Sequence, residues 1–151
     1  MSAGYSGTPL VRKLGLKPGM RVRLLGGPAT YWDLLGGPPA SLEVTLLTSE
    51  DDDAAASDAY ADATPADFSH LFATTEAGLA ERFAAAREGM AEDGMVWASW
   101  PKKSSGVASE IGRADVMAAG KAVGLVDVKV CAVDATWSGL KFVIPVADRL
   151  G

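Results

Sequence analysis

The sequence is poor in the residues that build metal centres and covalent frameworks. Its 151 residues include one cysteine, Cys131, and one histidine, His70. A lone cysteine excludes an internal disulfide framework and a cysteine-based zinc site. A single histidine without acidic neighbours in sequence makes no metal site, so we expect His70 to be a hydrogen-bonded structural residue rather than a general base. Cys131 lies in an apolar segment, where we expect a buried small hydrophobe and not a nucleophile.

Long apolar runs are also missing. No window approaches the roughly 20 apolar residues that a membrane helix needs. The N-terminus has no apolar core of signal-peptide length before its first charge. We therefore expect a cytoplasmic protein with no membrane partner, and the length fits one domain over residues 1–151.

Basic residues are outnumbered, 14 against 19 acidic ones, for a formal charge of −5. An acidic total argues against a nucleic-acid partner, which needs a basic surface. The charges are unevenly placed, because five basic and no acidic residues precede Asp33, and nine acidic and no basic residues run from Asp33 to Asp67. The two blocks can mark an interaction surface. We favour the simpler interpretation, in which they neutralise each other or simply solvate the surface. We expect residues 50–67 to be an acidic loop, since the glycine and terminal glutamate of a calcium loop are absent.

The pattern that is present alternates strands and helices. The expected strands are 20–25, 42–48, 68–73, 95–100, 126–133 and 140–146, and the expected helices are 9–14, 29–35, 75–90 and 109–124. This alternation predicts an α/β fold, a small three-layer Rossmann-like sheet that is mostly parallel. The last two strands are expected to close it as an antiparallel hairpin.

The order of elements resembles a reduced S-adenosylmethionine-dependent methyltransferase, with the glycine-rich run PGMRVRLLGG at residues 18–27. Three segments, Lys13 to Val22, Trp100 to Ser109 and Gly124 to Ile144, are similar to the bacterial domain-of-unknown-function family number three thousand and fifty-two. This resemblance implies a methyltransferase-like, Rossmann-like fold. It supplies candidate residues but no reaction.

Ligands of open parallel sheets bind beyond the carboxyl ends of the strands. The candidate ligand-binding residues follow the first and fourth expected strands or lie in the final hairpin: Gly26, Gly27, Tyr31, Trp32, Trp100, Lys102, Lys103, Ser104, Ser105, Trp137 and Ser138. The Lys102–Gly106 run offers ammonium and hydroxyl groups to an anion, although an exposed loop that serves solubility fits equally well. We assign no catalytic residue and no metal ligand.

These observations predict a non-catalytic or weakly catalytic binding domain, without a cofactor, for a small anionic ligand or a protein partner. The alternative is an S-adenosylmethionine-dependent methyltransferase with a degenerate cofactor turn. In that alternative Glu50 and Asp51 suit the ribose hydroxyls, whereas Pro28 removes an amide donor from the turn. A third alternative is a homodimer that buries exposed tryptophans.

Overall fold

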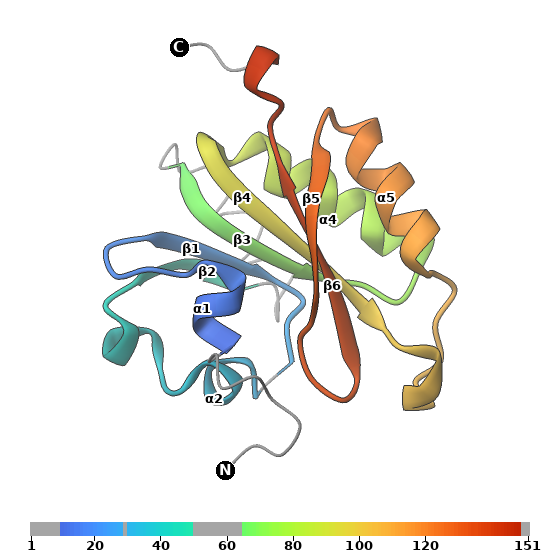
Figure 1. Ribbon diagram of the computed structural model, residues 1–151, viewed down its shortest axis with the longest axis horizontal. Coiled ribbons are helices and arrows are strands. Elements are labelled where there is room, and N and C mark those ends of the chain that lie inside the picture. Colours follow the sequence, from blue (N-terminus) through green and yellow to red (C-terminus); the bar gives the residue numbers. More distant parts are fainter. Residues whose placement is uncertain (1–9, 29, 50–64, 149–151) are drawn as a thin grey trace.

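The computed structural model describes residues 10–28, 30–49 and 65–148, which form a six-stranded sheet (Figure 1). Its order is β2-β1-β3-β4-β6-β5. The strands are β1 Arg21–Leu25, β2 Thr45–Ser49, β3 Ala66–Phe72, β4 Met90–Pro101, β5 Val126–Ala132 and β6 Trp137–Val143. The pairs from β2 to β4 are parallel, and β6 is antiparallel to both β4 and β5. The expected mostly parallel sheet with an antiparallel hairpin is confirmed.

Helices cover both faces of this sheet. They are α1 Leu10–Leu14, α2 Tyr31–Leu35, α4 Glu76–Glu88 and α5 Arg113–Ala122. Side chains of β3 alternate between two hydrophobic clusters: Phe68 and Phe72 pack on the side of α1 and α2, and Leu71 packs on the side of α4 and α5. Figure 1 shows the two helix pairs on opposite sides of the sheet. The three-layer arrangement follows from this alternation.

The largest differences from the expected boundaries are at β2, β4, α5 and β6, and β6 begins at Trp137 rather than at residue 140, so Trp137 and Ser138 lie in the strand and not in the turn before it. β2 begins at Thr45 because a 3-10 turn and a left-handed Glu43, with φ of 59°, precede it. β4 begins at Met90 because it pairs with β3 across a register shift that the spacing of side chains does not reveal. α5 begins only at Arg113, after Gly112, whose N–H is accepted by the Asp115 carboxylate at 2.8 Å. The expected loop at 50–67 lies outside the described residues up to 64, and residues 66 and 67 already belong to β3.

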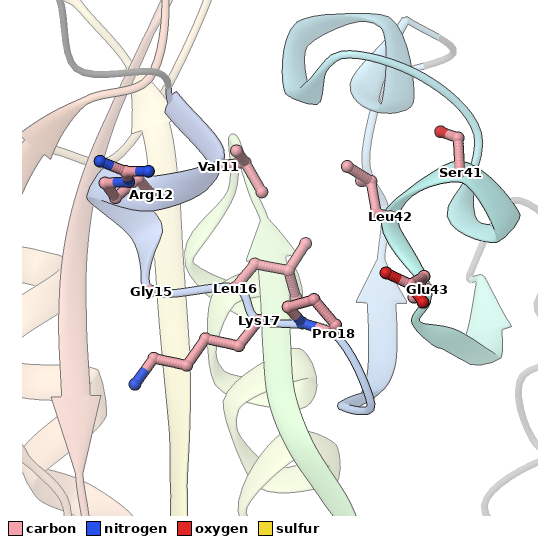
Figure 2. Close-up of a pocket in the computed structure, with 9 residues that line it drawn as sticks. All are labelled: Val11, Arg12, Gly15, Leu16, Lys17, Pro18, Ser41, Leu42 and Glu43. Carbon is pink, nitrogen blue, oxygen red and sulfur yellow. The ribbon is translucent and has the colours of Figure 1, made fainter.

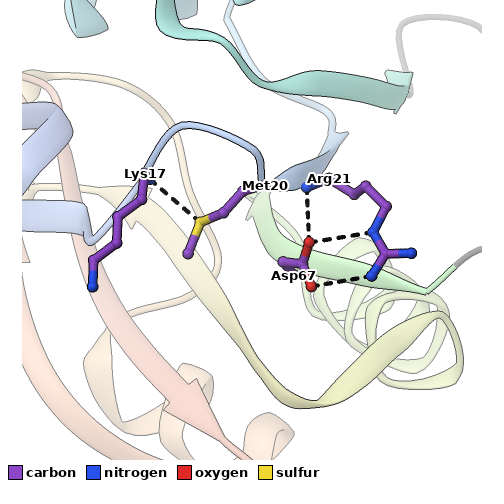
Figure 3. A network of polar contacts seen from close by, with 4 residues as sticks. All are labelled: Lys17, Met20, Arg21 and Asp67. Carbon is purple, nitrogen blue, oxygen red and sulfur yellow. Dashed lines mark hydrogen bonds and ion pairs between the residues drawn. The ribbon is translucent and has the colours of Figure 1, made fainter.

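An ion pair joins the amino ends of β1 and β3 (Figure 3). Asp67 Oδ2 accepts hydrogen bonds from the Arg21 backbone N–H at 2.9 Å and from Nε at 3.3 Å. Asp67 Oδ1 accepts a third from Nη2 at 3.4 Å. Next to this pair, the Lys17 N–H donates to the Met20 sulfur at 3.4 Å. At this pair, therefore, the early basic block and the acidic block neutralise each other.

The Arg21–Asp67 pair predicts a pH-dependent contribution to stability. Burial raises the pKa of Asp67, but hydrogen bonds and the charge of Arg21 outweigh it and lower that pKa overall. The contribution is therefore present above the ordinary carboxyl pKa and is lost as the pH falls through the folded value. Since the pair is partly exposed, we expect Asp67→Asn to cost about 0.5–1 kcal/mol at neutral pH. Urea unfolding should show this loss near pH 7 and not in acid below the folded pKa, and a loss that is independent of pH would contradict it.

Candidate functional site

The carboxyl ends of β1 and β3 form a topological switch point. β1 has β2 on one side and β3 on the other. α2 follows β1 and packs in the cluster with α1, whereas α4 follows β3 and packs in the opposite cluster. Because the two connections leave on opposite faces, this fold class predicts a ligand-binding crevice between these strand ends.

The Gly26–Gly27 turn lies at this crevice. Gly26 has a left-handed backbone conformation, with φ of 76°, which residues with a side chain rarely adopt. A Cβ atom there would lie 2.9 Å from the Cζ atom of Arg82. At Gly27 a Cβ atom would meet the Phe72 ring at 3.5 Å, an ordinary contact distance. Gly26 therefore lets the backbone approach Arg82 closely, whereas a side chain at Gly27 would fit against Phe72.

Arg82 is a residue of this site that sequence reasoning missed. It projects from α4, and its Nη1 donates to the Phe72 carbonyl at 2.7 Å. Its guanidinium therefore lies between the ends of β1 and β3, beside Gly26. A guanidinium is always charged and presents a planar set of donors that suits a carboxylate or a phosphate. No motif marks it in the sequence, where it reads as one polar position of an amphipathic helix.

A buried polar network lies beside the turn and connects three elements. Tyr31 Oη is 2.9 Å from His70 Nδ1, and Ser99 Oγ is 2.7 Å from His70 Nε2. All three residues are buried, and the His70 ring stacks on Phe72 with centroids 4.4 Å apart. Burial lowers the pKa of His70 to about 3 and raises the pKa of Tyr31 above its ordinary value.

This network decides two of the sequence predictions. The expected structural, hydrogen-bonded role of His70 is confirmed, because both ring nitrogens are engaged within the core. Tyr31 was expected to face a ligand, but it is 1% exposed and anchors α2 to β3.

The tryptophans expected at the edge separate into two groups. Trp100 was expected to contact a ligand, but it is 8% exposed and packs in the cluster under α4 and α5. Trp137 is half-buried and packs edge-on against Phe72, with ring centroids 5.0 Å apart. Trp32 is also half-buried and packs against Tyr31, with centroids 5.2 Å apart. Trp137 therefore contacts Phe72 at the carboxyl end of β3, and Ser138 next to it is half-buried.

The loop expected to bind anions uses two of its four polar side chains to hold itself. The Lys102 ammonium donates to the Asp134 carbonyl at 2.7 Å. The Ser105 hydroxyl donates to the Lys102 carbonyl at 2.6 Å. Lys103 and Ser104 are exposed. The anion site stays a prediction, with fewer groups directed at solvent than the sequence suggests.

A cavity of about 430 Å³ lies elsewhere (Figure 2). Its lining segments are residues 15–18, which lead into β1, and residues 41–43, which lead into β2, together with two residues of α1. The cavity therefore lies toward the amino ends of these strands, away from the crevice. It contains none of the candidate residues expected from the sequence.

Metal and thiol chemistry find no support in the described part of the chain. Within residues 10–28, 30–49 and 65–148, no three histidine, cysteine or acidic side chains gather to hold a metal ion. Cys131 is half-buried rather than buried as expected. Burial raises the pKa of its thiol despite nearby lysines, so the thiol is not activated. No helix in the same ranges is long and apolar enough to cross a membrane.

The buried histidine predicts a titration behaviour that one measurement checks. The folded pKa of about 3 lies below the ordinary value of 6.5. The unfolded chain therefore binds a proton that the folded chain excludes, and stability falls as the pH drops from about 6.5 toward 3. Because the chain has one histidine, its NMR signals are unambiguous. We expect no titration between about pH 5 and pH 8, and a midpoint near the ordinary value would contradict the buried network.

The tyrosine hydroxyl should be important for stability and not only for packing. Tyr31→Phe leaves the ring in place but removes the partner of His70 Nδ1 inside the core. An unsatisfied buried polar group costs about 1–3 kcal/mol. We expect urea unfolding of the variant to show a loss in that range. A variant as stable as the wild type would indicate that water replaces the hydroxyl.

Comparisons with known proteins agree on the fold. A scan against family models and a search of curated proteins both find no match, so the family expected from the sequence remains a prediction. Among solved structures, a TehB-like S-adenosylmethionine-dependent methyltransferase from Corynebacterium glutamicum is 14% identical, with a TM-score of 0.61 over 94% of this chain and 90% of that one. A methyltransferase from Aquifex aeolicus is 13% identical, with a TM-score of 0.59 over 88% and 86%.

A third similar structure is the magnesium protoporphyrin IX methyltransferase of Synechocystis with bound S-adenosylmethionine. It is 15% identical, with a TM-score of 0.60 over 89% of this chain and 74% of that one. At such identities the likeness concerns the backbone. The chain has the Rossmann-like fold of S-adenosylmethionine-dependent methyltransferases.

Proposed function

We propose that this chain binds S-adenosylmethionine in the crevice between β1 and β3 and acts as a small methyltransferase. The observation that carries the proposal is the Gly26–Gly27 turn, which lies at the switch point of the sheet beside the guanidinium of Arg82. Structures with the same fold include proteins with this cofactor bound, among them a fibrillarin from Aeropyrum pernix. That cofactor binding is a property of those proteins. The Gly26–Gly27 turn is the reason we propose it for this chain.

The residues present fit the amino-acid end of the cofactor. Gly26 and Gly27 carry no side chain where a ligand must come close to the backbone. Arg82 offers a fixed positive charge for the carboxylate of the methionine part. The acidic residues expected to hold the ribose, Glu50 and Asp51, lie outside the described residues.

Each crevice residue has a part in such a reaction. The cofactor, when bound, supplies an electrophilic methyl group. Arg82 binds and orients the carboxylate, and the edge-on pair of Phe72 and Trp137 forms an apolar wall that excludes water. His70 does not remove a proton from the acceptor, because it is buried, neutral and hydrogen-bonded at both nitrogens.

The other reading, a non-catalytic domain for anions, has less support. Its main loop commits the Lys102 ammonium to the Asp134 carbonyl and the Ser105 hydroxyl to the loop itself. The similar solved structures are largely methyltransferases, which favours the methyltransferase reading. A protein partner and a homodimer stay predictions.

Calorimetry with S-adenosylhomocysteine, the demethylated product, tests the proposal. We expect the wild type to bind it, and Gly27→Ala to bind it at least about tenfold more weakly, a loss of about 1.4 kcal/mol. The added methyl group would occupy space that the ligand needs next to the backbone of residue 27. It would meet the Phe72 ring at an ordinary contact distance of 3.5 Å, so the variant should still fold. Gly112→Ala is the matched control, because its methyl group meets nothing within 4 Å at the start of α5.

Two outcomes would contradict the proposal. One is a folded wild type that binds neither S-adenosylmethionine nor its product at millimolar concentration. The other is equal affinity of the wild type and Gly27→Ala, which would place any binding away from the crevice. Circular dichroism of the variant separates lost binding from lost folding.

A further inference from the structure

Lysines lie close together at the edge of the sheet that β6 and β5 form. Lys129 on β5 and Lys141 on β6 are direct cross-strand partners. Lys141 is also the partner of Trp97 on β4, whose indole N–H donates to the Leu14 carbonyl at 2.7 Å. Because cross-strand partners point to the same face, both lysines lie on the face that carries α1.

Lys17 reaches the same place from the segment after α1. Figure 2 shows its side chain extending toward the strands and away from Glu43 on the far side of the cavity. Burial lowers the pKa of Lys141, and the positive charges of Lys129 and Lys17 lower it further. Like charges directly opposite on neighbouring strands destabilise a sheet. The cluster therefore has an energetic cost that the fold alone does not explain.

Only one of the three has a structural task. The Lys129 ammonium donates to the Lys13 carbonyl at 2.9 Å, at the end of α1, where a cation also favours the helix dipole. Within the described ranges, neither ammonium of Lys17 and Lys141 has a hydrogen bond or an ion pair. The nearest acidic residue of β5, Asp127, is the partner of the core residue Phe142 and so lies on the opposite face.

The acidic composition of the chain makes a group of neighbouring lysines unexpected. The chain carries 19 acidic residues against 14 basic ones, so neighbouring cations would be balanced by acids if charges were mixed evenly. Arg21 of the early basic block is paired with Asp67, and Arg23 is buried. In the segment that leads into β1, Lys17 is exposed, and its side chain extends toward the strands (Figure 2).

We propose that Lys17, Lys129 and Lys141 form a binding site for a phosphate or diphosphate group of a small molecule. Three point charges from three segments suit an anion with several charged oxygens, and a carboxylate would neutralise only one of them. Outside this cluster the net charge of the protein is strongly negative, which disfavours a long polyanion. The site lies on the face of the sheet and does not depend on the proposed cofactor crevice.

Titration with inorganic pyrophosphate, followed by two-dimensional NMR of the backbone amides, tests this site. We expect saturable shifts in residues 13–20 and in β5 and β6, at constant ionic strength set with sodium chloride. Lys141→Gln should weaken binding at least about fivefold and, without ligand, should be no less stable than the wild type, because it removes a like-charge contact. Lys121→Gln is the matched control, an exposed lysine at the end of α5 on the opposite face.

A second variant keeps the test decisive if Lys141→Gln folds poorly. Lys17→Gln changes an exposed side chain without a hydrogen bond and should also weaken binding at least about fivefold. The proposal is overturned if pyrophosphate causes no shifts beyond those of sodium chloride, or if both variants respond like the wild type. It is also overturned if a single-stranded octanucleotide binds this face more tightly than pyrophosphate, since the partner would then be a nucleic acid.

Discussion

The two hydrogen bonds of His70 are the interaction on which the geometry of the candidate site depends. Through them one imidazole on β3 holds Tyr31 of α2 on one side and Ser99 of β4 on the other. Each member is buried, so releasing any one leaves a polar atom unsatisfied in the core. The Gly26–Gly27 turn begins where β1 ends and leads directly to the anchored Tyr31. Its course is therefore fixed at both ends.

Charge in this protein acts through local contacts. A net charge of −5 repels anions at long range, yet salt screens such repulsion beyond about 8–10 Å. Inside that distance the named neighbours decide, and at two places these are cationic: Arg82 at the crevice and the lysines on the face of β5 and β6. Two residues of the early basic block add no free positive charge to the surface, because Arg21 is paired with Asp67 and Arg23 is buried. The net charge therefore does not predict which ligands the protein can hold.

Local patterns predicted most of the fold and only part of the candidate site. The helix expected from residue 75 is present, capped by the Thr75 hydroxyl, which accepts the Gly78 N–H at 3.0 Å, and the glycine turn after β1 lies at the carboxyl edge. The segment MVWASW carries apolar residues on both faces, so alternation puts Trp97 and Trp100 on opposite faces but did not reveal which helix layer each one contacts. Arg82 could not be found either, because its place depends on how α4 packs over β3 and β4.

Register explains why the lysine cluster was beyond sequence reasoning. On β5 the pairing with β6 shifts between Asp127, which lies opposite Phe142, and Lys129, which lies opposite Lys141. In a regular strand, residues two apart share a face, so Asp127 would lie beside Lys129 and neutralise it. The extra residue of this bulge moves the carboxylate to the other face and leaves the two lysines together. A bulge also protects an edge strand from pairing with another chain, and exposed Val128 and Val130 make β5 a strand that needs such protection. One inserted residue therefore both protects the edge of the sheet and places Lys129 opposite Lys141 with no carboxylate between them.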